Sequence, residues 1–132
     1  MQFEGREVYN IGKIDKRIYK CITEDIITED VIITDERISH IKERHPEDYE
    51  FYSEKIKIAV TDPDYILEAN KPNTAFVLKS INTKDRNIQL ILRLVTSADN
   101  PDLKNSVITF LIVSDKKWNK YLRNKKILYK KK

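Results

Sequence analysis

Apolar residues recur in four strand-length segments from residue 65 onward: residues 65–69, 74–81, 87–96 and 106–113. The connections between them are rich in turn-forming Asn, Pro, Asp and Ser residues. Strands that follow one another after short connections usually pair antiparallel. The pattern therefore predicts a twisted antiparallel sheet of about four strands.

The segment before these strands has the periodicity of helices. Thr34 can cap a helix that begins at Asp35 and runs to His45, because Pro46 disfavours continuation beyond the residue before it. A second helix fits residues 48–60, in which several apolar residues share one face: Tyr52, Ile56, Ala59 and Val60. Helices followed by a run of strands indicate an α+β domain, with the N-terminal helices packed on one face of the sheet.

The two ends of the chain are less strongly patterned. Residues 7–22 are interpreted as two short strands or an extended arm around a turn near Asp15, and residues 31–33 form a short apolar run. After Ser114, which can cap a helix, apolar residues recur at helical spacing: Trp118, Tyr121 and Leu122. We therefore expect a short C-terminal helix.

The length of 132 residues fits one domain, and a hydrophobic fraction of 40% with 35% charged residues is typical of a globular chain. We expect an N-terminal extension or strands over residues 1–30, a core over residues 31–128 and a basic tail over residues 129–132. Cys21 is the only cysteine, so an internal disulfide is excluded. Charges near the start of the chain and the short apolar runs favour a cytoplasmic protein without a membrane partner.

The formal net charge is +4, and basic residues are concentrated near the C-terminus. The simplest interpretation is a solvated helix face and a frayed tail. The alternative is an arm that binds phosphates. Composition does not distinguish the two. The two glycines, Gly5 and Gly12, cannot form a glycine-rich phosphate loop, and we expect no cofactor.

Both histidines fall within one short segment of the first helix, His40-Ile41-Lys42-Glu43-Arg44-His45-Pro46. Residues on a helix advance by about 100° each, so His45 should share the apolar stripe with Ile38 and Ile41. His40 and Arg44, joined by Arg37, should line the seam between the helix and its neighbour. Histidine suits proton transfer near neutral pH.

Simpler interpretations exist for each histidine. His45 could be a helix-terminal histidine favoured by the macrodipole, and His40 could be an ordinary surface residue. A metal site is disfavoured, because helical ligand pairs lie three or four residues apart and these histidines lie five apart.

The strands add polar residues to this picture. Alternation along the strands predicts one wholly apolar sheet face, which includes Ile108, and an opposite face that carries one polar side chain per strand: Lys79, Arg93 with Gln89, and Thr109. In a meander these positions would be close neighbours. The alternative is an ordinary half-solvated sheet. Cations on a rigid sheet suit the charge that builds on phosphorus when RNA is cleaved without metal.

These residues together resemble the phage-encoded branch of the barnase–EndoU–colicin–RelE-like (BECR) nuclease superfamily. The resemblance spans residues 31–128 and rests on the His-Ile-x-x-Arg-His-Pro string, with Lys79, Arg93 and Asn105-Ser106-Val107-Ile108-Thr109 on the strands. It implies a metal-independent RNA endonuclease of phages or other mobile elements, with the role of a toxin or effector as the expected context. The alternative is a non-catalytic domain that binds nucleic acid or a protein.

The resemblance also implies the site. His40, His45, Arg93 and Thr109 would be catalytic, and further residues would bind the phosphates: Arg37, Arg44, Lys79 and Gln89. Some relatives have a glutamate or a further histidine on the strands, and none stands there in this chain, so the acid and base assignments stay open. The expected partners are RNA, either tRNA or another structured or single-stranded RNA, and a protein inhibitor or phage protein.

Overall fold

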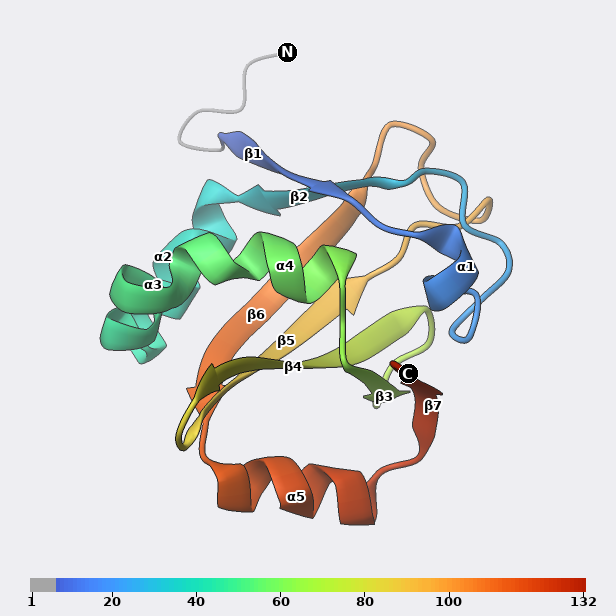
Figure 1. The fold of residues 1–132 in the computed structure, drawn as a ribbon. Helices are drawn as coiled ribbons and strands as arrows, with labels where there is room; N and C mark the ends of the chain where they lie inside the picture. The colour runs from blue at the N-terminus through green and yellow to red at the C-terminus, as the bar shows by residue number, and fades with distance from the viewer. Residues whose placement is uncertain (1–6) are drawn as a thin grey trace.

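The computed structural model describes residues 7–132 as an α+β fold around a seven-stranded mixed sheet (Figure 1). The strands are β1 (Val8–Lys13), β2 (Asp30–Thr34), β3 (Tyr65–Glu68), β4 (Thr74–Thr83), β5 (Arg86–Arg93), β6 (Asn105–Val113) and β7 (Ile127–Lys130). Their order across the sheet is β1-β2-β6-β5-β4-β3-β7. The predicted antiparallel meander is β3 to β6. The sheet is larger than the four strands predicted, because β1 and β2 extend it at one edge and β7 at the other.

The helices differ in how they begin, because some have a capping side chain at the N-terminus and others have none. They are α1 (Lys16–Tyr19), α2 (Asp35–Arg44), α3 (Pro46–Tyr52), the 3₁₀ turn η1 (Ser53–Lys55), α4 (Ile56–Thr61) and α5 (Asp115–Asn124). The Thr34 hydroxyl accepts a hydrogen bond from the Arg37 N–H, and the Ser114 hydroxyl accepts one from the Lys117 N–H. The helix predicted over residues 48–60 instead begins at Pro46 and is interrupted by η1.

Helices cover both faces of the sheet, whereas the sequence pattern assigned a face only to the N-terminal helices. Figure 1 shows α4 and α5 on opposite sides of the central strands. β4 is apolar on both faces, so each face needs a cover. Residues of α5 pack on the face that carries Phe76 and Leu78: Trp118, Tyr121 and Leu122. The face that carries Ala75 and Val77 belongs to the main core, to which α4 contributes Ala59 and Val60.

The N-terminal segment is part of the same fold. β1 pairs antiparallel with β2, and β2 pairs in parallel with the start of β6, where Val31 lies opposite Asn105. Tyr19 is fully buried, and its hydroxyl donates to the Val60 carbonyl at 2.8 Å. The segment expected to be two strands or an extended arm is therefore one strand followed by a helical turn.

The C-terminal segment is anchored as well. β7 pairs antiparallel with β3, and the Lys131 N–H donates to the Asp64 carbonyl at 2.8 Å. The Lys131 side chain also donates to Asp62 at 2.7 Å. The basic tail expected at residues 129–132, for which a frayed end was the simplest interpretation, is therefore held to the rest of the fold as far as Lys131. Within residues 7–132, no helix is both long enough and apolar enough to span a membrane.

Candidate functional site

Helices α2 and α3 lie along the second half of β6. β2 pairs with β6 only at Asn105 and Ser106, so the rest of that strand edge lacks a strand partner on this side. One carboxylate oxygen of Asp48, at the start of α3, accepts a hydrogen bond from the Ile112 N–H at 3.0 Å. The helices therefore take the place of a neighbouring strand, and side chains of α2 face residues of β6 across this seam.

A cavity of about 250 Å³ opens at the seam, and we call it the histidine cavity. It is lined by Arg37, His40, Ile41, Arg44, His45, Ile108 and Thr109. Five of these residues were singled out from the sequence as candidates for one site. Helix α2 and the residue that follows it place both histidines beside Thr109 of β6, although Thr109 is more than 60 positions later in the chain.

The geometry of α2 explains why these side chains converge. Residues three, four and seven positions apart lie on one side of a helix, which groups Arg37, His40, Ile41 and Arg44. His45 stands at the end of the helix with φ −140° and ψ 62°, because Pro46 starts the next one. Its Nδ1 lies 3.8 Å from the Asp48 carboxylate. The oxygen involved is the one that accepts from Ile112, so the strand edge fixes the carboxylate beside the imidazole.

A β-bulge in β6 shapes the wall of the cavity. Ile91 of β5 lies opposite Thr109, whereas the next residue, Leu92, lies opposite Val107, so Ile108 is the extra residue. Val107 is fully buried in the core, and Ile108 lines the cavity. The expectation that Ile108 belongs to the apolar core face is therefore wrong, because the bulge exchanges the facing of these two residues.

A second cavity of about 480 Å³ adjoins the first, and we call it the Arg93 cavity. Its lining residues are Arg37, Ala69, Asn70, Lys71, Thr74, Phe76, Ile91, Arg93, Ile108 and Lys125. Arg37 and Ile108 line both cavities, so the two are neighbours. Arg93 therefore lines the cavity next to the histidines rather than the histidine cavity itself.

Arg93 is tied to the loop that follows its strand. Its Nη2 donates to Asp99 at 2.9 Å, and its Nη1 donates to the Leu94 carbonyl. The Thr96 N–H and then the Arg93 guanidinium lower the pKa of the Asp99 carboxyl. The Arg93 side chain keeps 35% of its surface exposed. The guanidinium is therefore oriented by Asp99 and still accessible from the cavity.

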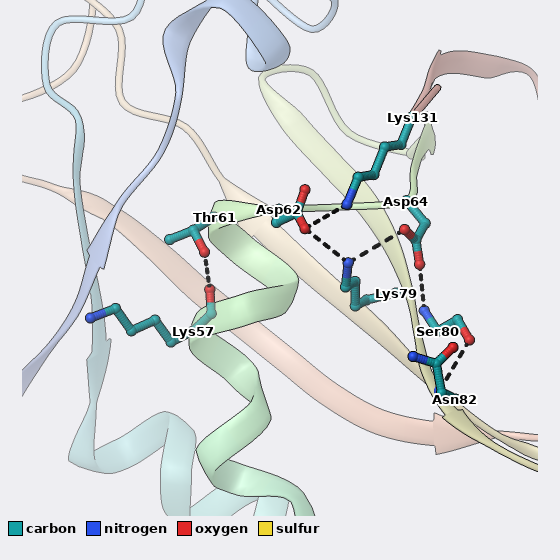
Figure 2. Close-up of polar contacts among 8 residues, drawn as sticks. All are labelled: Lys57, Thr61, Asp62, Asp64, Lys79, Ser80, Asn82 and Lys131. Carbon is teal, nitrogen blue, oxygen red and sulfur yellow. Dashed lines mark hydrogen bonds and ion pairs between the residues drawn. The ribbon is translucent and has the colours of Figure 1, made fainter.

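Lys79 lies on the other face of the sheet, which corrects the expectation that it neighbours Arg93. Lys79 pairs with Ile88 and Thr74 pairs with Arg93, and positions 88 and 93 face opposite sides of β5. Figure 2 shows the Lys79 ammonium between Asp62 and Asp64, at 3.2 Å and 3.4 Å. The alternation predicted within β4 and within β5 is correct, but the residues of β4 that were expected to face the same side as Arg93 face the opposite side.

Gln89 does share the face of Arg93, yet it is only 5% exposed and lies between Leu78 and Leu111. It is not among the residues that line either cavity. In its place the Arg93 cavity contains residues that the sequence did not single out: Asn70, Lys71, Thr74 and Lys125. Antiparallel pairing of β4 and β5 could have suggested Thr74, because it brings the start of one strand beside the end of the other.

The lining of both cavities is cationic. Among residues 7–132, no aspartate or glutamate lines either one. Within residues 7–132, Arg37, Arg44 and Lys71 have no carboxylate at ion-pair distance. The described part of the chain also contains no group of three or more His, Cys, Asp or Glu side chains placed to hold a metal ion. The site can therefore hold an anion next to two imidazoles.

Comparisons with known proteins agree with the resemblance. Neither the curated proteins nor the solved structures gave a match. A family model described as phage-Barnase-EndoU-ColicinE5/D-RelE like nuclease2, PBECR2, matches residues 7–130. The match covers nearly the whole chain and includes both cavities. The chain therefore belongs to the PBECR2 family, the phage branch of the BECR nucleases that its helix histidines and strand cations had indicated.

Proposed function

We propose that this member of a nuclease family is an endoribonuclease that cleaves RNA without a metal ion. The observation that carries the proposal is the histidine cavity, in which His40 and His45 lie beside Arg37, Arg44 and the Thr109 hydroxyl. Two imidazoles provide a base and an acid of the type that works near neutral pH. The arginines provide the positive charge that a phosphate transition state needs.

In the proposed reaction the ribose 2′-oxygen attacks the adjacent phosphorus and forms a new P–O bond. One histidine takes the 2′-OH proton. The other histidine donates a proton to the departing 5′-oxygen as the P–O5′ bond breaks. The products are a 2′,3′-cyclic phosphate and a free 5′-OH. The reaction requires the 2′-OH, so the proposed substrate is RNA rather than DNA.

The cations have distinct places in this scheme. Arg37 lies between the two cavities, so it is positioned to bind the scissile phosphate from one side. Arg44 lines the histidine cavity and can bind the same group. Arg93 would stabilise charge from the neighbouring cavity, since a guanidinium can grip two phosphate oxygens at once. Lys79 is not part of the proposed site, because it lies on the other face between two carboxylates.

The proposal is tested by cleavage of total RNA in the presence of EDTA. We expect the wild type to cut RNA at the same rate with and without EDTA. Substitutions His40→Ala and His45→Ala should each lower the rate about 100-fold or more, because each removes a proton-transfer group. Lys84→Ala is the matched control, since Lys84 is exposed in the β4–β5 turn and lines neither cavity.

The products sharpen this test. Fragments should carry 2′,3′-cyclic phosphates, and an RNA with a single 2′-deoxyribose at the cut site should stay intact at that position. Equal rates for wild type and both histidine variants would overturn the proposal. Salt-dependent RNA binding without any product would instead identify a non-catalytic binding domain.

A further inference from the structure

The proposed chemistry uses only the edge of the Arg93 cavity and leaves most of its surface without a role. The interior of this cavity is apolar, with Phe76, Ile91 and Ile108 among its lining residues. Phe76 makes an edge-to-face contact with Tyr121, with ring centroids 4.8 Å apart. The Phe76 ring of this apolar floor is thus packed against α5, and a cavity of about 480 Å³ falls within the range of small-molecule pockets, roughly 300–1,000 Å³.

Cations from three separate parts of the chain surround this floor. Arg37 comes from α2, Lys71 from the β3–β4 connection and Lys125 from the end of α5. The Lys125 ammonium lies 4.6 Å from the centre of the Phe76 ring and 3.5 Å from the Glu68 carbonyl, which hold it over the floor. No carboxylate from the described part of the chain lines the cavity, so it favours a ligand that combines a flat apolar group with negative charge.

Polar groups of the cavity can form hydrogen bonds with the polar edge of such a ligand. The Asn70 side chain is exposed and can both donate and accept hydrogen bonds. The Thr74 hydroxyl donates to the Pro72 carbonyl at 2.9 Å, so it is left to accept from a ligand. An apolar floor, a cationic rim and a few hydrogen-bonding groups are what a nucleotide needs, since its base has apolar faces, a polar edge and flanking phosphates.

We propose that the Arg93 cavity is a subsite for one unpaired nucleotide next to the scissile phosphate, so that the substrate is single-stranded RNA. This inference rests on the proposed function, because it places the cut in the adjoining histidine cavity. The base packs on the floor, while Lys71 and Lys125 bind its flanking phosphate. A base within a duplex is stacked on both faces and paired along its edge, so it cannot enter a cavity of this kind.

Binding can be measured independently of cleavage. The probe is a uridine trinucleotide with 2′-methoxy groups, which cannot undergo the proposed reaction, added to the full chain and followed by amide chemical shifts in NMR. We expect the shifts to concentrate at residues 70–76 and at Lys125, and an RNA duplex of about 12 base pairs that contains the same sequence to produce none there. Shifts confined to other surfaces, or equal shifts with the duplex, would overturn the subsite.

Two substitutions test the rim. Lys71→Ala and Lys125→Met should each weaken binding of the trinucleotide about fivefold at low salt, and each should reduce the slope of log Kd against log salt by about one. Methionine keeps an aliphatic chain over Phe76, so Lys125→Met preserves the packing. Lys84→Ala removes an equal charge at the far end of the strands and should leave binding unchanged. Equal losses in all three variants would indicate general charge attraction and refute the subsite.

Cleavage assays separate the subsite from the proposed function. In the wild type, adding a third nucleotide on one side of a dinucleotide should raise kcat/KM about tenfold, and Lys71→Ala should remove most of that gain. Cleavage without any gain from a third nucleotide on either side would overturn the subsite and leave the proposed function standing. Trinucleotide shifts at the cavity in a chain that cuts no RNA would support the subsite and overturn the proposed function.

Discussion

Lys79 and Arg93 lie in two charged regions on opposite faces of the central strands. The two regions differ in the side chains that surround each cation. On the α4 face, Lys79 is 8% exposed and lies between the carboxylates of Asp62 and Asp64 (Figure 2). On the α5 face, Arg93 has one carboxylate partner, Asp99, and opens into a cavity lined by further cations. The comparison indicates that burial and pairing, rather than residue type, decide whether a strand cation supports the fold or is accessible to an anion.

The charged region around Lys79, on the α4 face, connects three segments that are distant in the sequence. Asp62 accepts from both Lys79 and Lys131, which attaches the end of the chain after β7 to the turn after α4. Asp64 contacts Lys79 and also accepts from the Ser80 N–H at 2.7 Å. We call Lys79, Asp62, Asp64 and Lys131 the Lys79 cluster. Its groups bind one another, and we infer that its contribution is to stability.

The largest expected contrast comes from Arg93→Ala. If Arg93 stabilises charge on the phosphate, the cleavage rate should fall about 100-fold or more. The free energy of unfolding should change by less than about 1 kcal/mol, because the ion pair with Asp99 is partly exposed. RNA cleavage and urea denaturation of the same preparation measure both quantities. A rate within threefold of the wild type would remove Arg93 from the site.

Lys79→Met should show the opposite pattern. The substitution keeps the aliphatic stem but leaves two carboxylates without their shared buried partner. Breaking a buried pair costs about 3–5 kcal/mol, and the partial exposure of both carboxylates reduces the expected loss to about 2 kcal/mol. The folded variant should cut RNA at nearly the wild-type rate.

Urea denaturation measures the stability of this variant, and the rate is compared at a urea concentration where wild type and variant are both folded. Lys84→Met is the control, because it makes the same chemical change at an exposed turn position. A large loss of activity with unchanged stability would contradict the division between the two regions.

The contrast also shows which parts of the fold are encoded locally. Thr34 and Ser114 cap α2 and α5 as the sequence predicts, and Pro46 separates α2 from α3. These are signals carried by a few neighbouring residues. The strands β3 to β6 were predicted for the same reason, since each has its own apolar pattern and is bounded by turn residues.

The facing of residues on the strands is not encoded in this way. Both faces of β4 are apolar, so the pattern of Phe76, Val77 and Leu78 does not show which face carries Arg93 of the next strand. The amino-acid sequence of β6 does not indicate the bulge at Ile108, which is seen only in the pairing with β5. Pairing across the sheet settles both questions, and it is a property of the tertiary structure.

The same distinction applies to the candidate site. Arg37, His40 and Arg44 could be grouped from the sequence because helical periodicity places them on one side of α2. Lys71 and Lys125 could not be grouped with them, because they come from a turn and from the end of a later helix. Residues contributed by connections between elements are found only when the chain is folded.

The smallest expected effect concerns the pH dependence of the Lys79 cluster. The hydrogen bond from Lys131, and to a lesser degree that from Lys79, lowers the pKa of the Asp62 carboxyl below its ordinary value. A carboxyl with a lowered folded-state pKa stabilises the fold above its unfolded pKa of about 3.9, and this contribution disappears as the pH falls through the lower folded value. Asp62→Asn removes the contribution at every pH.

The difference in melting temperature between wild type and Asp62→Asn should therefore be largest near pH 7, begin to shrink below pH about 4 and go on shrinking as the pH falls through the lowered folded-state pKa of Asp62. Its size at pH 7 should be a few degrees at most, because the carboxylate is 40% exposed. Asp102→Asn is the control, since Asp102 is exposed and forms no ion pair within residues 7–132, so its difference should stay near zero throughout. A difference for Asp62→Asn that does not change with pH would show that the charge of Asp62 is not what holds the C-terminal strand.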